Sequence, residues 1–200
     1  MGGAAISRLV LVLLLGVTLY IASLVIWPIE ELYLDGNSHL DRGQILALTD
    51  IYPGDPWLWA TNRKLRSLRD SPWVLEARME RPRIGVLRIV IRERVPVATL
   101  YTSEGPVGLA VDGTRLPGAK SSGPVIEGFG EDRTMEALQV AALIPAAEHI
   151  TYNPAGFTVD WGGRRLWIRS LEYLRMWLPH VSSIRGSDVA IYSWGVSIRR

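Results

Sequence analysis

The chain has 200 residues, of which eight are tryptophan and none is cysteine, and its formal net charge is +2. The missing cysteines exclude thiolate catalysis, disulfide bonds and cysteine zinc sites, so each domain has to be held together by its own apolar core. Beyond residue 27 about 170 residues remain, enough for one medium domain or two small ones.

An uncharged apolar run from Leu9 to Ile26 comes first. About 18 residues rising about 1.5 Å each nearly cross a hydrocarbon core of about 30 Å. The run predicts a transmembrane helix over residues 9–27 behind a cytoplasmic tail of residues 1–8. The alternative, a cleaved signal peptide, has a shorter apolar region that ends in a small-x-small site. Arg8 indicates an N-terminus inside the cell. We therefore expect a single-pass protein of the cytoplasmic membrane, in contact with lipid through this anchor and mostly extracytoplasmic.

The next segment, residues 28–95, has the pattern of two helices between strands. A short strand at residues 32–34 ends in a turn at 35–37, and a helix with Ser38 as its N-cap follows. A second helix after Thr61 ends at Pro72. Apolar and polar residues then alternate over residues 74–80 and 86–93, with Leu75 among the inward positions. The predicted order is β-α-α-β-β.

Charge is segregated within this segment. Residues 28–55 hold six acidic side chains and one basic one, whereas residues 56–94 hold ten basic and four acidic ones. The basic stretch either faces lipid head groups or an acidic partner, or forms a solvated surface that pairs with the acidic stretch. The second interpretation is the simpler.

Residues 96–200 predict a mainly antiparallel β domain with helices packed on it. Short apolar runs separated by Gly and Pro predict strands up to about residue 128, and a helix follows over residues 131–146. Residues 157–161 and 164–168 form a hairpin across Gly162-Gly163. A helix over residues 171–178 stops at Pro179. Strands at 189–192 and 196–198 end the chain, the last at a sheet edge. The fold class is α+β.

No arrangement of residues predicts catalysis. The three histidines, His39, His149 and His180, lie in no metal-binding spacing, and Gly162-Gly163 lacks the Lys-Ser/Thr of a phosphate loop. Ser38, His39 and Asp41 share one helical turn, which cannot easily give the geometry of a catalytic triad. We expect no enzyme activity, cofactor, metal, nucleic-acid partner or small-molecule substrate.

Short motifs occur in a characteristic order behind the apolar run. They are Leu34-Asp35-Gly36-Asn37, then Ser71-Pro72-Trp73-Val74, then Glu93-Arg94-Val95-Pro96-Val97-Ala98. In this order they resemble the FtsQ/DivIB family of bacterial cell-division proteins. The resemblance implies a POTRA domain over residues 28–95, whose motif residues are Gly36, Asn37, Pro72, Trp73, Val74, Glu93, Arg94 and Pro96, and a C-terminal β domain over residues 96–200.

The resemblance also implies a non-enzymatic scaffold of the division machinery at the septum. Such a scaffold binds partners of the FtsB (DivIC) and FtsL type and helps assemble or regulate septal cell-wall synthesis. In β-augmentation, a partner's strand would pair with the edge strand formed by the last residues. The residues expected to contact it are Tyr192, Trp194, Gly195, Val196 and Ile198.

Two questions stay open at this level. Tyr192 and Trp194 either contact the partner or only cap the small core. Residues 189–191, Val-Ala-Ile, replace the Asp-Leu-Arg run frequent in the family, so the charged contact expected from that Arg is missing.

The alternative function is a POTRA-bearing protein-export or envelope-assembly factor, although no room remains after Leu100 for the barrel that such proteins usually carry.

Overall fold

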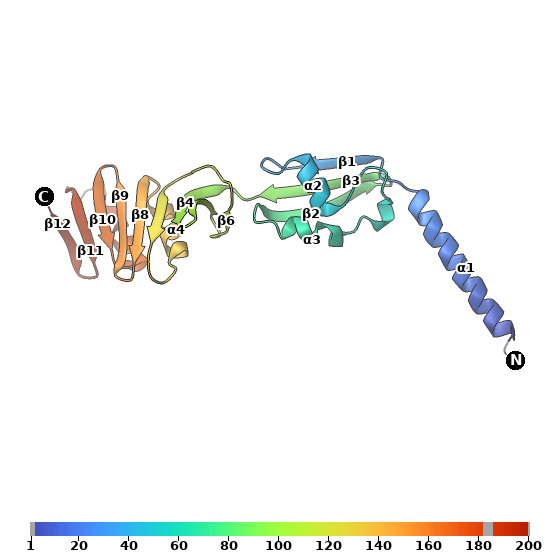
Figure 1. Cartoon of the computed structure of the whole chain (residues 1–200). Helices are drawn as coiled ribbons and strands as arrows, with labels where there is room; N and C mark the ends of the chain where they lie inside the picture. The colour runs from blue at the N-terminus through green and yellow to red at the C-terminus, as the bar shows by residue number, and fades with distance from the viewer. Residues whose placement is uncertain (1–2, 182–185, 200) are drawn as a thin grey trace. The chain divides into compact units, whose positions relative to one another are not determined.

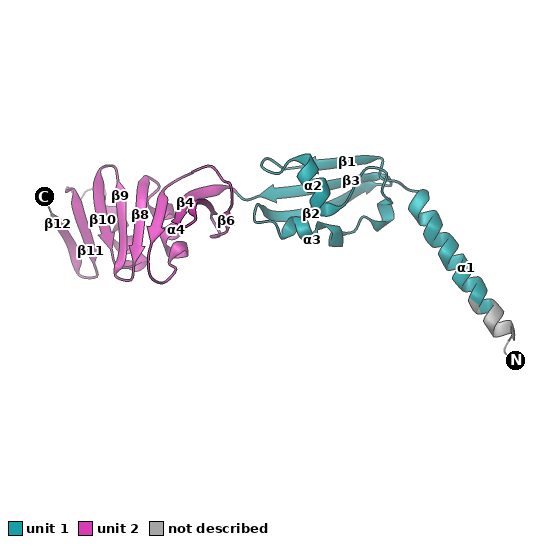
Figure 2. Ribbon diagram, viewed as in Figure 1, with its two compact units in different colours: residues 1–94 teal, residues 95–200 magenta. Residues whose placement is uncertain are grey.

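The computed structural model describes residues 3–181 and 186–199. The chain divides into two compact units, residues 1–94 (unit 1) and residues 95–200 (unit 2), shown in Figures 1 and 2. Both units combine helices with a sheet, in agreement with the expected α+β class. Met1 and Gly2 of the predicted cytoplasmic tail lie outside the described residues.

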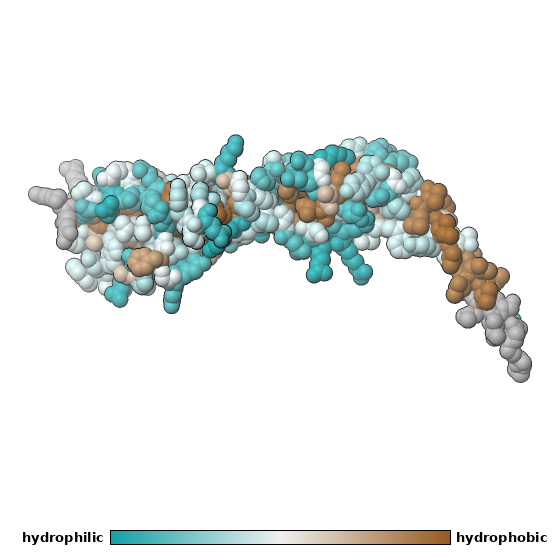
Figure 3. Space-filling view, in the orientation of Figure 1, coloured by the Kyte–Doolittle hydropathy of each residue, from teal (hydrophilic) through white to brown (hydrophobic). Residues whose placement is uncertain are grey.

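Unit 1 begins with the helix α1 (Gly3–Val25), whose described side chains are mostly apolar (Figure 3). The transmembrane helix predicted over residues 9–27 is wrong, because no helix of the described part of the chain combines the length and the apolar character that a membrane crossing needs.

The rest of unit 1 is a three-stranded sheet with short helices. In chain order its elements are β1 (Glu31–Asp35), α2 (Arg42–Thr49), the 3-10 turns η1 (Trp57–Trp59) and η2 (Asn62–Leu65), α3 (Arg66–Arg69), β2 (Val74–Arg83) and β3 (Val86–Glu93). The strand order is β1-β3-β2, with β1 parallel and β2 antiparallel to β3. Ile45, Leu68 and Ile89 are fully buried, so α2 and α3 share a core with the sheet.

Two local predictions in unit 1 need correction. The N-cap of α2 is Asp41 and not Ser38: Asp41 accepts from the backbone N–H of Gln44 at 2.8 Å, and the Gln44 side chain accepts from the Asp41 N–H at 2.9 Å. Leu75 is 42% exposed, while Val74 and Ala77 are buried. The cause is a register shift between Val74 and Glu76, because an extra residue in one strand reverses the alternation of faces.

Unit 2 is a nine-stranded sheet with two helices. Its elements are β4 (Pro96–Thr102), β5 (Gly105–Ala110), β6 (Arg115–Leu116), β7 (Val125–Gly128), α4 (Thr134–Leu143), β8 (Ala147–Asn153), β9 (Gly156–Trp161), β10 (Arg164–Ile168), α5 (Leu171–Val181), β11 (Asp188–Tyr192) and β12 (Gly195–Arg199). The strand order is β12-β11-β10-β9-β8-β7-β4-β5-β6. Most neighbours are antiparallel, but β4 with β7, β7 with β8 and β10 with β11 are parallel.

The core of unit 2 lies between α4, α5 and one face of the sheet. Phe157, Ile150 and Leu174 are fully buried there, and each such side chain stabilises the fold by about 1.5–3 kcal/mol. The helix predicted over residues 171–178 was expected to stop at Pro179. This end is wrong, because the helix observed there, α5, continues to Val181. A proline in the last turn of a helix removes only one N–H donor, so the helix tolerates it there.

Candidate functional site

The residues of the predicted POTRA motif meet where β3 ends, beside the loop that precedes α2. The Glu93 carboxylate accepts hydrogen bonds from the backbone N–H groups of Ser38 at 3.0 Å, His39 at 2.6 Å and Leu40 at 2.9 Å, and from the Ser38 hydroxyl at 3.0 Å. Partial burial acts to raise the pKa of Glu93, but these four bonds outweigh it and hold the pKa below its usual value. Ionised Glu93 therefore ties the loop to the sheet.

Arg94 joins the second motif to this junction. Its Nη1 donates to the carbonyls of Pro72 at 3.0 Å and Val74 at 2.6 Å, and its backbone N–H donates to the Trp73 carbonyl at 2.8 Å. The Trp73 ring in turn stacks on His39, with ring centroids 3.4 Å apart. The Pro-Trp-Val and Glu-Arg motifs thus form one cluster through backbone and ring contacts.

Gly36 and Asn37 complete the cluster, whereas Pro96 belongs to unit 2. Gly36 has φ +83°, and a Cβ built on it would lie 2.1 Å from the Ile91 carbonyl oxygen. Only glycine fits this position without a shift of the backbone. The Asn37 side chain donates to the Leu40 carbonyl at 3.0 Å. Pro96 begins β4 in unit 2, opposite Ala110. The cluster in unit 1 therefore uses its polar groups inside the fold.

The terminal hairpin of unit 2 has the opposite character. Strands β11 and β12 pair antiparallel across a two-residue turn at Ser193 and Trp194, and β12 is an edge of the sheet (Figure 1). Tyr192 lies opposite Gly195 and Ile191 opposite Val196. In a two-residue hairpin the closing pair exchanges hydrogen bonds, and the next pair does not.

The pairing of β11 with β12 determines which backbone groups of β12 point outward. The N–H and C=O groups of Gly195 and Ser197 point toward β11, whereas those of Val196 and Ile198 point away from it, at the open edge. The Val196 side chain packs against the core, and the Ile198 side chain is 46% exposed. The backbone groups of Gly195 and Ser197 therefore hold β12 to β11, while the outward N–H and C=O groups of Val196 and Ile198 stay available to another strand.

Three aromatic rings lie next to this edge. Tyr192 and Trp194 stack with centroids 5.2 Å apart and planes 9° apart, and Trp167 of β10 lies 5.3 Å from Tyr192. Trp194 is 77% exposed. A hollow of about 530 Å³ beside them includes Arg165, Asp188 and Ser197 in its lining. Trp194 is thus not part of the core, and Tyr192, which is half-buried, covers Trp167.

Sequence reasoning missed Trp167 and Arg165. The alternation in residues 164–168 could have placed both on the face opposite Leu166 and Ile168. What no sequence pattern indicated is the parallel pairing of β10 with β11, which puts Trp167 opposite Ala190 and beside the terminal hairpin. A helix, α5, and residues 182–187 separate these two strands in the chain, so their pairing depends on the tertiary fold.

The other candidate groups are dispersed. His39 stacks on Trp73, His149 Nε2 lies 3.5 Å from a Glu127 carboxylate oxygen, and the His180 ring lies 6.0 Å from Trp177. Within residues 3–181 and 186–199 no group of three or more His, Asp or Glu side chains could hold a metal ion.

The segregated charges of unit 1 partly pair with each other. Ion pairs join Lys64 to Asp50 at 3.3 Å, Arg83 to Glu31 at 2.9 Å and Arg88 to Asp35 at 3.3 Å, each linking the basic stretch to the acidic one. All three are solvent-exposed, and such pairs contribute little to stability. They favour the interpretation of this stretch as a solvated, internally paired surface.

Comparison with known proteins agrees with the motif cluster. Residues 27–94 match the family model described as "POTRA domain, FtsQ-type". The match covers the sheet and helices that the cluster joins, and it supports the assignment of the chain to the FtsQ/DivIB family. No curated protein matches the sequence.

Proposed function

We propose that this chain, whose residues 27–94 form a POTRA domain of the FtsQ type, is a non-enzymatic scaffold of the bacterial division machinery at the septum. The family match is the observation that carries the proposal. It supports a role in cell division and in protein–protein interactions within the divisome, and proteins of this family are generally non-enzymatic. The partners in the proposal are of the FtsB (DivIC) and FtsL type, and the outcome is the assembly or regulation of septal cell-wall synthesis.

The proposed mode of binding is addition of a partner strand to β12. The outward N–H and C=O groups of Val196 and Ile198 offer two donors and two acceptors to an extended segment. Main-chain bonds of this kind give affinity without requiring a particular partner sequence. An open edge strand that stays in water is also a risk for aggregation, which a dedicated partner would remove.

Side chains next to the edge would supply the specificity. Trp194 and Tyr192 stack on each other, and Trp167 lies tilted against Tyr192, so the three rings form one aromatic cluster. Trp and Tyr are among the residues most enriched at the energetic centres of interfaces. The exposed Ile198 side chain adds an apolar contact at the end of the strand. A partner with apolar side chains flanking its paired strand would fit this surface.

The test uses Ile198→Pro in the full chain, with Ile198→Val as the matched control. Proline removes the outward N–H of residue 198 and leaves the pairing with β11 intact, so the hairpin should stay folded. We expect at least tenfold weaker binding of the FtsB-type partner from the same bacterium, measured by calorimetry, and unchanged binding for Ile198→Val. Undiminished binding by Ile198→Pro would refute pairing at this edge.

A second variant checks the direction of the bonds. Ser197→Pro removes an N–H that points toward β11, so it should destabilise the hairpin itself, as seen by hydrogen exchange in β11 and β12. The location at the septum is tested separately with a fluorescent fusion of the full chain. Uniform fluorescence in dividing cells would contradict it.

A further inference from the structure

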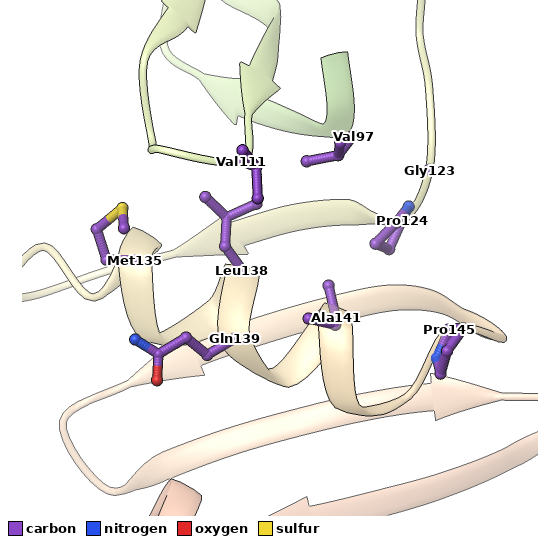
Figure 4. A pocket seen from close by; sticks show the side chains of 10 residues that line it. Val97, Val111, Gly123, Pro124, Met135, Leu138, Gln139, Ala141 and Pro145 are labelled. Carbon is purple, nitrogen blue, oxygen red and sulfur yellow. The ribbon is translucent and has the colours of Figure 1, made fainter. Parts of the chain in front are cut away.

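An apolar groove lies in unit 2 between α4 and the region of β4 and β5, at the opposite end of the sheet from β12 (Figure 4). Its volume is about 410 Å³, within the usual range of binding sites. Val111, Val97 and Pro124 line one side, and Met135, Leu138 and Ala141 line the other. None of its described lining residues belongs to the POTRA domain or to the terminal hairpin.

Two glycines allow the close packing that shapes the groove. Gly113 has φ +79°, and a Cβ there would lie 2.3 Å from the Met135 sulfur, so glycine lets Met135 pack against the turn after β5. Gly123 has φ +60°, and a Cβ there would lie 1.9 Å from the Val97 carbonyl oxygen. Both positions favour glycine for their backbone angle and for their close contacts. The groove is therefore a preformed feature of the fold.

The apolar side chains of the groove are unusually accessible. Val111 is 76% exposed, Met135 48% and Val97 40%. Single exposed apolar residues are ordinary, but a contiguous set around a concave surface is typical of an interaction site. Methionine is also common where a surface has to adapt to a partner.

The lining determines which backbone the groove can accept. Among its ten lining residues only Gln139 has a polar side chain, and the Gln139 Oε1 already accepts from Arg175 Nη2 at 3.3 Å. An extended peptide would bury its N–H and C=O groups against a lining whose side chains offer them few hydrogen-bond partners, and each buried group left without a partner costs free energy. A helix satisfies its backbone hydrogen bonds internally, and its apolar ridge could pack along the length of α4.

Charge gives the second constraint. Among the described residues that line the groove none has a charged side chain, so the ridge that enters it must be uncharged. At the rim Arg175 of α5 is exposed and bonds to the Gln139 amide, and no carboxylate bonds it in the described part of the chain. A carboxylate beside the ridge of the occupant would therefore meet a cation.

We propose that this groove binds an amphipathic helix of a partner protein, with an apolar ridge at i, i+3, i+4 and i+7 and an acidic residue beside that ridge. The mode is helix-in-groove recognition, distinct from strand addition at β12. The inference does not rest on the proposed division role, because the groove and the edge strand share no residue.

The test uses three synthetic 18-residue peptides of the same composition and the full chain labelled at its methionine methyl groups. The first peptide carries a Leu/Ala ridge at helical spacing flanked by Glu. In the second the flanking residues are exchanged so that Lys takes the place of Glu. In the third the apolar residues alternate with polar ones. We expect the first to bind and to shift the Met135 methyl signal, with Met79 and Met176 as unchanged references, the second to bind several-fold more weakly, and the third not to bind.

Matched variants locate the site. Met135→Glu should weaken binding of the first peptide at least tenfold, whereas Met176→Glu, the same change at a methionine that is 56% exposed on α5, should leave it unchanged. Met135 and Met176 are both exposed, so both variants should fold. The methyl shifts are measured on the unmodified chain, so they test binding even if a variant does not fold. The proposal is overturned if the alternating peptide binds as tightly as the first, if no peptide shifts Met135, or if the Met135 signal changes with protein concentration alone, which would indicate a second copy in the groove.

Discussion

The motif cluster of unit 1 and the terminal hairpin of unit 2 use their polar groups in opposite ways. Around Glu93 and Arg94, hydrogen bonds close inside the fold and hold a loop and two strands together. Around Val196 and Ile198, the outward backbone groups lie at the open edge of the sheet, and the nearby Trp194 ring is exposed to solvent. The comparison teaches that the most distinctive short motifs of this chain specify its fold, whereas the surface suited to binding carries a much weaker sequence signal.

The largest expected effect tests the motif cluster at Gly36. Gly36→Ala should destabilise unit 1 by about 3 kcal/mol or more, because it combines a left-handed backbone angle with a backbone clash against Ile91. Gly54 is the matched control: it has φ +94° and no heavy atom within 4 Å of a built Cβ, so Gly54→Ala should cost only about 1 kcal/mol. Urea unfolding of the full chain measures both. Equal losses would mean that the clash at Gly36 relaxes, and the cluster would then be looser than described.

A smaller effect is expected at Glu93. Glu93→Ala should cost about 2 kcal/mol, because three backbone N–H groups and one hydroxyl lose a charged acceptor. Glu104→Ala, at an exposed turn, should change stability by less than about 0.5 kcal/mol. Thermal unfolding compares the two variants.

The same carboxylate predicts a pH dependence. Its pKa in the folded protein is lowered, so its contribution to stability is complete above the unfolded value of about 4.3 and is lost as the pH falls through the lower folded value. The difference in unfolding free energy between the wild type and Glu93→Gln should therefore be constant near pH 7 and shrink below about pH 4.3. A constant difference down to pH 2 would show that the ionised form has no special role.

The smallest effect on stability is expected at Trp194, where the two roles of the aromatic pair can be separated. Trp194→Ala should change the free energy of unfolding by less than about 0.5 kcal/mol, because the ring is 77% exposed. Tyr192→Ala should cost about 1 kcal/mol, since Tyr192 is half-buried and contacts Trp167. If both variants also weaken partner binding tenfold or more, the rings are contacts for the partner. Unchanged binding would leave them as a cover for the small core.

Much of the architecture could be predicted from local patterns. Alternating residues located β3 and the hairpin of β9 and β10, and the order of helices and strands in unit 1 agrees with the POTRA pattern, because side-chain period and breakers act over a few residues. Local reasoning was wrong about Leu75, where a register shift in β2 reverses the faces, and about the N-cap of α2. It was also wrong about a membrane-spanning helix, because no helix of the described residues is long and apolar enough to cross a membrane.

The sequence by itself determined the α+β class, the two-part order of elements and the motifs that a family model matches at residues 27–94. Only the tertiary structure decided that Glu93 and Arg94 act on a loop more than 50 residues away and on the start of β2. It also decided that Trp167 lies beside the terminal hairpin and that two glycines shape a groove beside α4. The physical reason is range: turns and alternation depend on neighbours in the chain, whereas strand order, edges and grooves depend on which distant segments share a core.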